Sequence, residues 1–300
     1  MGIHWHHVKA LISARKAGVQ FGRTLTVGRQ NLFITAFELK EMLRKDMPDV
    51  LARYDEFMVP HPTYSEPLFK LFGASEVVSM DASNYEGATI VHDMNFPIPA
   101  ELKGTFDFVD DGGTLEHVFT FPTAIRNCME LLKVGGHLVI NTPANNQFGH
   151  GFYQFSAELF FRVLSPENGF KVERMVAMEH FDGSPWFEVA DPAQVRSRVE
   201  LLNHTRRVEL AIRAVKTHNA EIFATVPQQS DYSAVWDSKT GIDTQDLFLR
   251  EPNRLREGIK KALERLSPRL ILNIRRMKNS RLNKRFSFEN QRKFFTPVKE

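Results

Sequence analysis

The chain has 300 residues, of which 42% are hydrophobic and 25% are charged, so a fibrous protein and a wholly disordered chain are both excluded. No run approaches the roughly 18 apolar residues of a membrane-spanning helix, and the first residues lack a secretion signal, so we expect a cytoplasmic protein without a transmembrane segment. The net charge of +3 conceals a basic end, because residues 254–300 hold 15 of the 39 Lys and Arg but only four of the 36 Asp and Glu.

In chain order, an amphipathic helix over residues 5–17 comes first. Apolar segments then alternate with helix-like stretches, which predicts a Rossmann-like α/β fold with a mostly parallel, seven-stranded sheet and helices on both faces. The expected strands are 24–27, 76–80, 89–92, 106–109, 137–140, 170–178 and 207–215. The expected helices are 37–53, 67–72, 122–132 and 156–164, with a weaker helical segment at 191–205. A boundary near residue 235 separates the domain 1–235, with its core at 20–180, from a basic, partly helical extension at 236–300 that contains a helix at 253–266.

Polar residues and glycines follow the expected strands at the points where the strands end. They are Gly28, Asp81, Asp93 and the cluster from Asp110 to His117. Ligands of open parallel sheets gather at these ends. Two carboxylates ending successive strands suit the hydroxyl and amino groups of a ribose and an adenine, and a glycine allows the backbone to come close to them. Taken singly, each aspartate could equally cap a turn.

With its segments EVVSMDAS, ATIVHDMN, FDFVDDGGTLEHV and LLKVGGHLVINTP, the chain resembles the class I S-adenosylmethionine-dependent methyltransferases over about residues 20–180. The resemblance implies that S-adenosylmethionine is the cofactor. It implies that Asp81 holds the ribose hydroxyls and that Asp93 and Met94 flank the adenine. It also implies that Asp110, Asp111 and Gly112 lie near the methionine end of the cofactor. By the same resemblance, Gly28 is the part that remains of the family's first glycine motif.

One segment departs from the family pattern, in which three glycines follow the first strand. Here Gly28 is followed by Arg29, Gln30, Asn31 and Leu32, and about 48 residues separate the first two strands. We infer that the helix beginning near Pro67 is the family's first helix. Tyr64 and Glu66, just before it, then replace part of the glycine loop's contacts with the cofactor.

Two histidines are candidate general bases, because an imidazole titrates near neutral pH. His117 precedes a helix and His150 lies in the long loop after the fifth strand; a surface or capping role is the alternative for His117. The acceptor-binding candidates are Glu116, Asn145, Asn146 and Tyr153. The loop could instead be a lid that shields the sulfonium from water.

Other signals are weaker. His4, His6 and His7 suggest a metal, but no further ligand follows at local spacing, so no metal site is expected. The lone Cys128 fits a buried helical position. The basic tail, with Phe286, Phe288, Phe294 and Phe295, fits a solvated extension best. Contact with an anionic membrane surface or with nucleic acid is the alternative, and nucleic acid is not expected as the substrate because the domain lacks a basic groove.

The predicted function is methyl transfer from S-adenosylmethionine to a hydroxyl of a small molecule or glycan by in-line displacement. The competing hypothesis is a non-catalytic binding or regulatory protein on a degenerate methyltransferase fold. A nicotinamide-dependent oxidoreductase is disfavoured, because the first turn lacks a G-x-G-x-x-G pattern.

Overall fold

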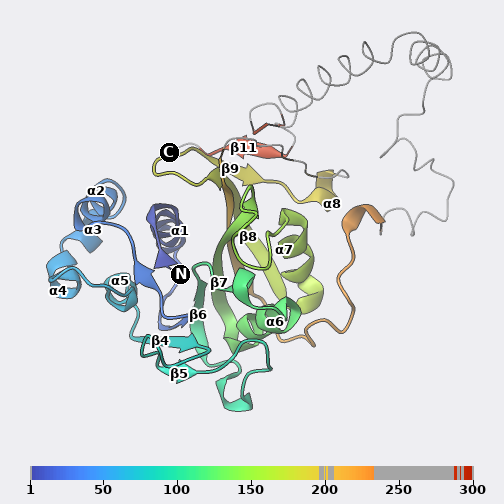
Figure 1. The fold of residues 1–300 in the computed structure, drawn as a ribbon, viewed down its shortest axis with the longest axis horizontal. Coiled ribbons are helices and arrows are strands. Elements are labelled where there is room, and N and C mark those ends of the chain that lie inside the picture. The colour runs from blue at the N-terminus through green and yellow to red at the C-terminus, as the bar shows by residue number, and fades with distance from the viewer. Residues whose placement is uncertain are drawn as a thin grey trace, which may run out of the picture.

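The computed structural model describes residues 2–195, 199, 201, 206–232, 287, 288, 291 and 294–298. Their main feature is a nine-stranded sheet in the order β11-β9-β8-β10-β7-β6-β2-β4-β5 (Figure 1). The strands are β2 (Arg23–Val27), β4 (Glu76–Asp81), β5 (Ile90–Val91), β6 (Phe106–Asp111), β7 (Leu132–Asn145), β8 (Phe170–Glu179), β9 (Trp186–Val189), β10 (Val208–Lys216) and β11 (Phe295–Pro297). A separate parallel pair is formed by β1 (Gly2–Ile3) and β3 (Asn31–Leu32).

The seven strands expected from the sequence are confirmed, and six of them run parallel. The exception is β10, which lies antiparallel between β7 and β8. The sheet is therefore mixed, and β9 and β11 extend it beyond the predicted edge. Neither added strand shows the long apolar pattern on which the sequence prediction depended.

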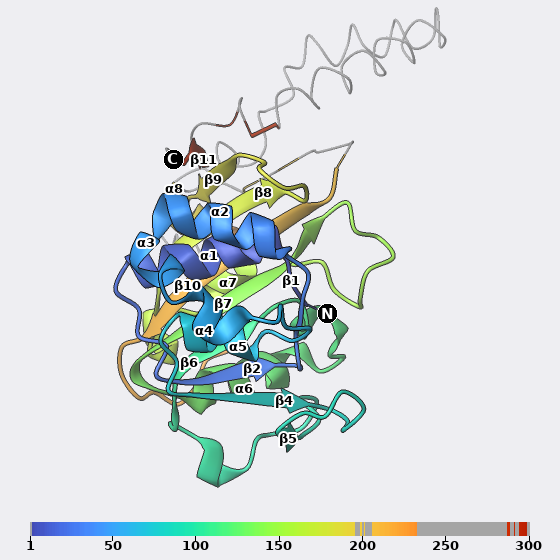
Figure 2. The same cartoon turned by 90° about the vertical axis from the view of Figure 1, so that its left-hand side faces the viewer.

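Helices cover both faces of the sheet, as Figures 1 and 2 show. One face carries α1 (Trp5–Lys16), α2 (Ala36–Asp46), α3 (Pro48–Leu51), α4 (Tyr54–Met58) and α5 (Glu66–Leu71); the other carries α6 (Phe121–Leu131) and α7 (Ala157–Val163). The remaining short helices are η1 (Ala100–Leu102), η2 (Leu115–His117), η3 (Pro166–Asn168) and α8 (Pro192–Val195). Successive residues of β7 point to opposite faces, so Leu138 joins the core beneath α6 and Val139 the core beneath α1.

The segment between β2 and β4 forms an inserted group of helices, α2 to α4, before α5 leads into β4. This order confirms that the helix near Pro67, rather than one directly after Gly28, precedes the second strand of the sheet. The expected helix at 37–53 is divided at Pro48, which begins α3. Proline lacks the backbone N–H that would continue the hydrogen bonds of α2.

The described part of the C-terminal extension packs on the body. Strand β11 pairs with β9, and the rings of Phe187 and Phe288 stack with centroids 4.5 Å apart. Phe288 and Phe295 are buried in the core beneath α7, so these two rings are unavailable to an external surface. The helix expected at 253–266 and the residue Phe286 lie outside the described residues, and the boundary near 235 stays a prediction.

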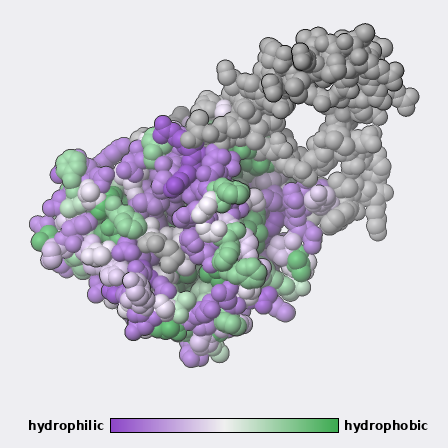
Figure 3. Space-filling model, in the orientation of Figure 1, coloured by the Kyte–Doolittle hydropathy of each residue, from purple (hydrophilic) through white to green (hydrophobic). Residues whose placement is uncertain are grey.

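The surface in Figure 3 mixes hydrophilic and hydrophobic residues. Among the residues that the structure describes, no helix combines the length and the apolar character needed to cross a membrane.

Candidate functional site

The carboxyl ends of β2, β4, β6 and β7 meet at one edge of the sheet, and the residues that follow them form the candidate site. Ligands of an open α/β sheet bind where the order of the strands reverses. Here this point is β2, which lies between β4 and β6. Gly28 follows β2, whereas Asp81 and Asp111 end β4 and β6.

Asp81 lies against the turn after β2. Its Oδ2 accepts a hydrogen bond from the Arg29 N–H at 3.3 Å, and its Oδ1 accepts one from the Ser83 N–H at 3.4 Å. Gly28 makes this turn at a φ of +79°, in the left-handed region that favours glycine. Because Asp81 is half-buried and both bonds are long, its carboxylate keeps the capacity to accept from ligand hydroxyls.

Arg29 connects three parts of this region. Its Nε donates to Glu66 Oε1 at 2.7 Å, its Nη1 donates to the Glu86 carbonyl, and its guanidinium lies 4.0 Å from the centre of the Tyr64 ring. Glu66 and Tyr64 therefore contact Arg29 beside the expected cofactor region, and their own contacts with a cofactor stay a prediction.

Gln30 fills the space between the ends of β2 and β6. Its side chain is fully buried, and its Nε2 donates to the Val27 carbonyl at 2.8 Å. A Cβ added to Gly112 would lie 2.1 Å from Gln30 Oε1, so Gly112 is the residue that allows this packing. The Gln30 side chain thus occupies a gap that a glycine at this position would leave open.

Asp110 is buried against α1. Its Oδ1 accepts a hydrogen bond from His7 Nε2 at 2.9 Å, and both side chains are at most 1% exposed. Its Oδ2 has no partner among the described residues. The carboxylate thus forms a buried link between β6 and α1, and its position near the methionine end of the cofactor, which the family resemblance implies, stays a prediction.

Asp111 and Glu116 form a buried acidic pair at the end of β6. Asp111 Oδ1 caps η2 by accepting from the backbone N–H groups of Thr114 and Leu115. Burial raises the pKa of Asp111 to about 8, and the charge of Asp110 raises it in the same direction. Burial, followed by the charge of Asp111, raises the pKa of Glu116 to about 8. The pair therefore holds protons near neutral pH.

Asp93 and Met94 lie beyond β5. Asp93 Oδ1 accepts from the backbone and side-chain nitrogens of Asn95, which closes a tight turn. Met94 is buried in the core beneath α6, and its carbonyl accepts from Asn127. Pairing of Asp81 with Val91 places Asp93 near the same edge of the sheet as Asp81, as predicted.

A cavity of about 390 Å³ opens beside the end of β6, and we call it the histidine cavity. Two His–Glu clusters line it, together with backbone and amide groups from β6, β7 and their loops. Its lining consists of Gly2, His4, Phe33, Gly112, Gly113, Glu116, His117, Asn141, Thr142, Pro143, Gln147, His150, His180, Arg207 and Glu209.

The first cluster contains three residues that the sequence singled out, Glu116, His117 and His150. Glu116 Oε1 lies 3.5 Å from His150 Nε2, and Glu116 Oε2 accepts from Thr142 Oγ1 at 3.4 Å. The two imidazole rings are 5.0 Å apart, and burial lowers the pKa of His117. The structure thus brings a carboxyl group and two imidazoles to one wall of the cavity.

The second cluster, His4, His180 and Glu209, was missed. His180 Nδ1 donates to Glu209 Oε1 at 2.5 Å, and His4 Nε2 lies 3.4 Å from Glu209 Oε2. The sequence contained a usable signal, because His180 directly follows β8 and Glu209 is an isolated acid in an apolar strand. These three residues are remote from one another in sequence, so no local spacing of ligands reveals the cluster.

The side chains of the other polar loop residues bond to backbone carbonyls rather than to these clusters. Asn145 Nδ2 donates to the Leu201 carbonyl, Asn146 Nδ2 to the Arg206 carbonyl, and the Tyr153 hydroxyl to the Phe119 carbonyl. Asn145 lines a separate, larger cavity of about 520 Å³ beside α7. These hydrogen bonds stabilise the loop, and Gln147 is the loop amide that lines the histidine cavity.

Comparisons with known proteins give distant likenesses only. No family model and no curated protein matches the chain. Among solved structures, the N-methyltransferase NodS from Bradyrhizobium japonicum, in complex with S-adenosyl-L-homocysteine, is 16% identical over 71% of this chain and 86% of its own, with a TM-score of 0.37. The YcgJ protein of Bacillus subtilis is 11% identical over 71% and 100%, with a TM-score of 0.38. The branched-chain polyamine synthase of Thermus thermophilus is 14% identical over 74% of this chain and 60% of its own, with a TM-score of 0.37.

These likenesses are too distant to bear on activity or substrate, and the fold is assigned from the strands themselves. From β5 to β7 the order is that of a doubly wound sheet, with the reversal at β2. The antiparallel strand β10 is inserted between β7 and β8. The chain therefore has a Rossmann-like α/β fold, as the sequence predicts, with a mixed sheet.

Proposed function

We propose that the chain is an S-adenosylmethionine-dependent methyltransferase acting on a hydroxyl group of a small molecule or glycan. The observation that carries the proposal is the position of the histidine cavity. It begins at Gly112 and Gly113, directly after the strand beside β2, and the carboxylate of Asp81 lies on the other side of β2. An acceptor in the cavity would meet a donor bound across the end of β2.

The residues of this chain fit the adenosine half of the cofactor. Asp81 retains acceptor capacity beside the Gly28 turn, which suits two ribose hydroxyls, and Asp93 lies near the same edge. The methionine half fits only if the Gln30 side chain leaves the space beside Gly112. That movement requires a change of side-chain rotamer and the loss of one hydrogen bond to Val27.

The bound cofactor would supply an electrophilic methyl group. The chain's own contribution is to orient the acceptor, exclude water and accept a proton. His117 and His150 suit proton acceptance, because both rings are exposed and line the cavity, and burial lowers the pKa of His117 so that its ring is neutral. Glu116 keeps its own proton near neutral pH, and Thr142 holds it at the cavity wall, where it can bind the acceptor.

We infer a second candidate function from the packing of Gln30. If its side chain stays in place, the fold binds no complete cofactor and acts as a binding or regulatory protein. The Gln30 Oε1 atom is buried and has no partner among the described residues, so its present position is not optimal. This favours movement of Gln30, and therefore the enzyme.

Titration calorimetry with S-adenosylmethionine and S-adenosylhomocysteine tests the cofactor site. We expect Asp81→Ala to weaken binding by about tenfold or more, because a charged hydrogen-bond acceptor contributes roughly 1.5–3 kcal/mol. Asp111→Ala is the control, since Asp111 is wholly buried and caps η2. Equal binding by wild type and Asp81→Ala would exclude the proposed ribose contact. If no binding occurs to folded wild-type protein at millimolar ligand, the enzyme proposal fails.

A second variant distinguishes the two candidate functions. Gln30→Gly removes the side chain that fills the gap, and we expect it to bind S-adenosylhomocysteine several-fold more tightly than wild type does. Binding by Gln30→Gly alone, with none by wild type, would support the non-catalytic protein. Unchanged affinity would show that Gln30 does not obstruct the cofactor. For proteins that bind, mass spectrometry of candidate acceptors identifies the methylated product.

A further inference from the structure

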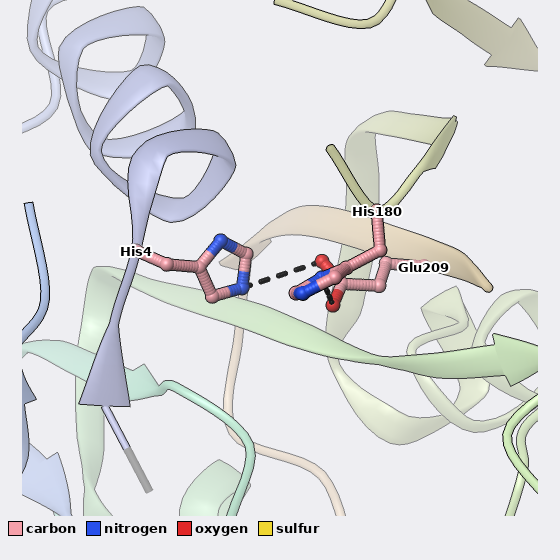
Figure 4. Close-up of side chains that lie close together, drawn as sticks. All are labelled: His4, His180 and Glu209. Carbon is pink, nitrogen blue, oxygen red and sulfur yellow. Dashed lines mark hydrogen bonds and ion pairs between the residues drawn. The ribbon is translucent and has the colours of Figure 1, made fainter. Parts of the chain in front are cut away.

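We propose that His4, His180 and Glu209 form a binding site for a divalent transition-metal ion in the wall of the histidine cavity. The three side chains come from the segment before α1, the loop after β8 and strand β10, and they point toward one another (Figure 4). One ligand atom of each lies within 4.8 Å of the others. Metal binding itself requires neither the cofactor nor the acceptor of the proposed function.

The distances suit a metal after a small movement. Ligand nitrogens and oxygens lie about 2.0–2.2 Å from Zn²⁺, so neighbouring ligand atoms around a tetrahedral ion are roughly 3.4 Å apart. His4 Nε2 already lies 3.4 Å from Glu209 Oε2. The 2.5 Å contact between His180 Nδ1 and Glu209 Oε1 is a hydrogen bond, and the metal would take the place of its proton.

Asn141 provides an independent indication of a ligand. It is 4% exposed and lines the same cavity, and its Nδ2 donates to Glu209 Oε2 at 3.2 Å. Its Oδ1 is buried and has no hydrogen-bond partner in the described part of the chain. A neighbouring amide that orients the carboxylate is a common support of metal sites. A metal-bound water would give Oδ1 the donor that it lacks.

The ligand set indicates which ions the site would take. Two imidazoles and one carboxylate favour Zn²⁺, Mn²⁺, Fe²⁺ or Co²⁺ over Mg²⁺ and Ca²⁺, which prefer oxygen ligands. Three protein ligands leave at least one coordination position, and the cavity gives it access to a small molecule. An oxygen atom of a small molecule in the histidine cavity would bind the metal at this open position.

The test uses the full chain, without an affinity tag, after removal of metals with a chelator. Titration calorimetry with Zn²⁺ should show one bound ion per chain, and Co²⁺ should give the visible absorption of a four- or five-coordinate complex. We expect His4→Ala and His180→Asn each to weaken Zn²⁺ binding by about tenfold or more. His180→Asn is the conservative variant, because asparagine can still donate to Glu209 and preserve the fold.

His150→Ala is the matched control, since it removes a histidine from the other cluster in the same cavity and should leave the affinity unchanged. Loss of binding in this variant but not in His4→Ala would place the metal at Glu116, His117 and His150 and overturn the assignment. So would the absence of both heat and a cobalt spectrum at millimolar metal. A chain that binds Zn²⁺ but no S-adenosylhomocysteine would keep this site while removing the proposed methyltransferase function.

Discussion

Replacing His7 with alanine is expected to lower the free energy of unfolding by about 3–5 kcal/mol, because it leaves the buried Asp110 carboxylate without its partner. His7 Nε2 supplies the hydrogen bond to Asp110 Oδ1, and Asp110 Oδ2 already lacks a partner among the described residues. Urea unfolding, followed by circular dichroism, measures the loss.

A double variant separates the unpaired charge from the lost packing. Asp110→Asn in the His7→Ala background should recover much of the stability, since a buried amide costs less than a buried carboxylate. His218→Ala, at an exposed position, should change the stability by less than about 0.5 kcal/mol. If the double variant is no more stable than His7→Ala, packing of the imidazole, rather than the charge of Asp110, holds α1 on the sheet.

Glu116→Gln is expected to stabilise the protein more at pH 8 than at pH 5. Burial raises the pKa of the Glu116 carboxyl from 4.5 to about 8. Between these values the unfolded chain releases this proton while the folded chain keeps it. Because the folded state binds more protons there, this group makes the folded state less stable as the pH rises. The glutamine amide does not ionise in this pH range, so this loss of stability with rising pH is absent from the variant.

The difference in unfolding free energy between wild type and Glu116→Gln should therefore grow between pH 5 and pH 8. Each unit by which the pKa of Glu116 differs between the folded and unfolded states contributes about 1.4 kcal/mol to this growth. The urea unfolding series is run with a chelator present, and Glu101→Gln is the control at an exposed position. A difference that stays constant with pH would show that Glu116 ionises as it does in the unfolded chain.

Much of the fold could be predicted from the sequence, because its parallel strands are short apolar runs with polar ends. The strand ending at Asp81 and that ending at Asp111 each show this pattern. The strands β9 and β11 could not be predicted in the same way. They are short, and β11 is an edge strand that pairs only with β9 among the described residues, so their sequences carry little periodicity.

The candidate site was predictable where one strand end supplies the chemistry. Glu116 and His117 adjoin β6, and the structure brings His150 to them. It was not predictable where the partners are remote in sequence. His4 and Glu209 meet only because β10 enters the sheet beside β7, and the link between His7 and Asp110 depends on how α1 crosses the sheet.

The position of β10 also bears on how the chain assembles during synthesis. Both of its neighbours, β7 and β8, leave the ribosome before it does, yet it separates them in the finished sheet. The nascent chain must therefore leave β7 and β8 unpaired with each other until β10 arrives, and such sequence-distant pairing is intrinsically slow. Glu209 belongs to β10, so the wall of the histidine cavity is complete only after β10 has joined the sheet.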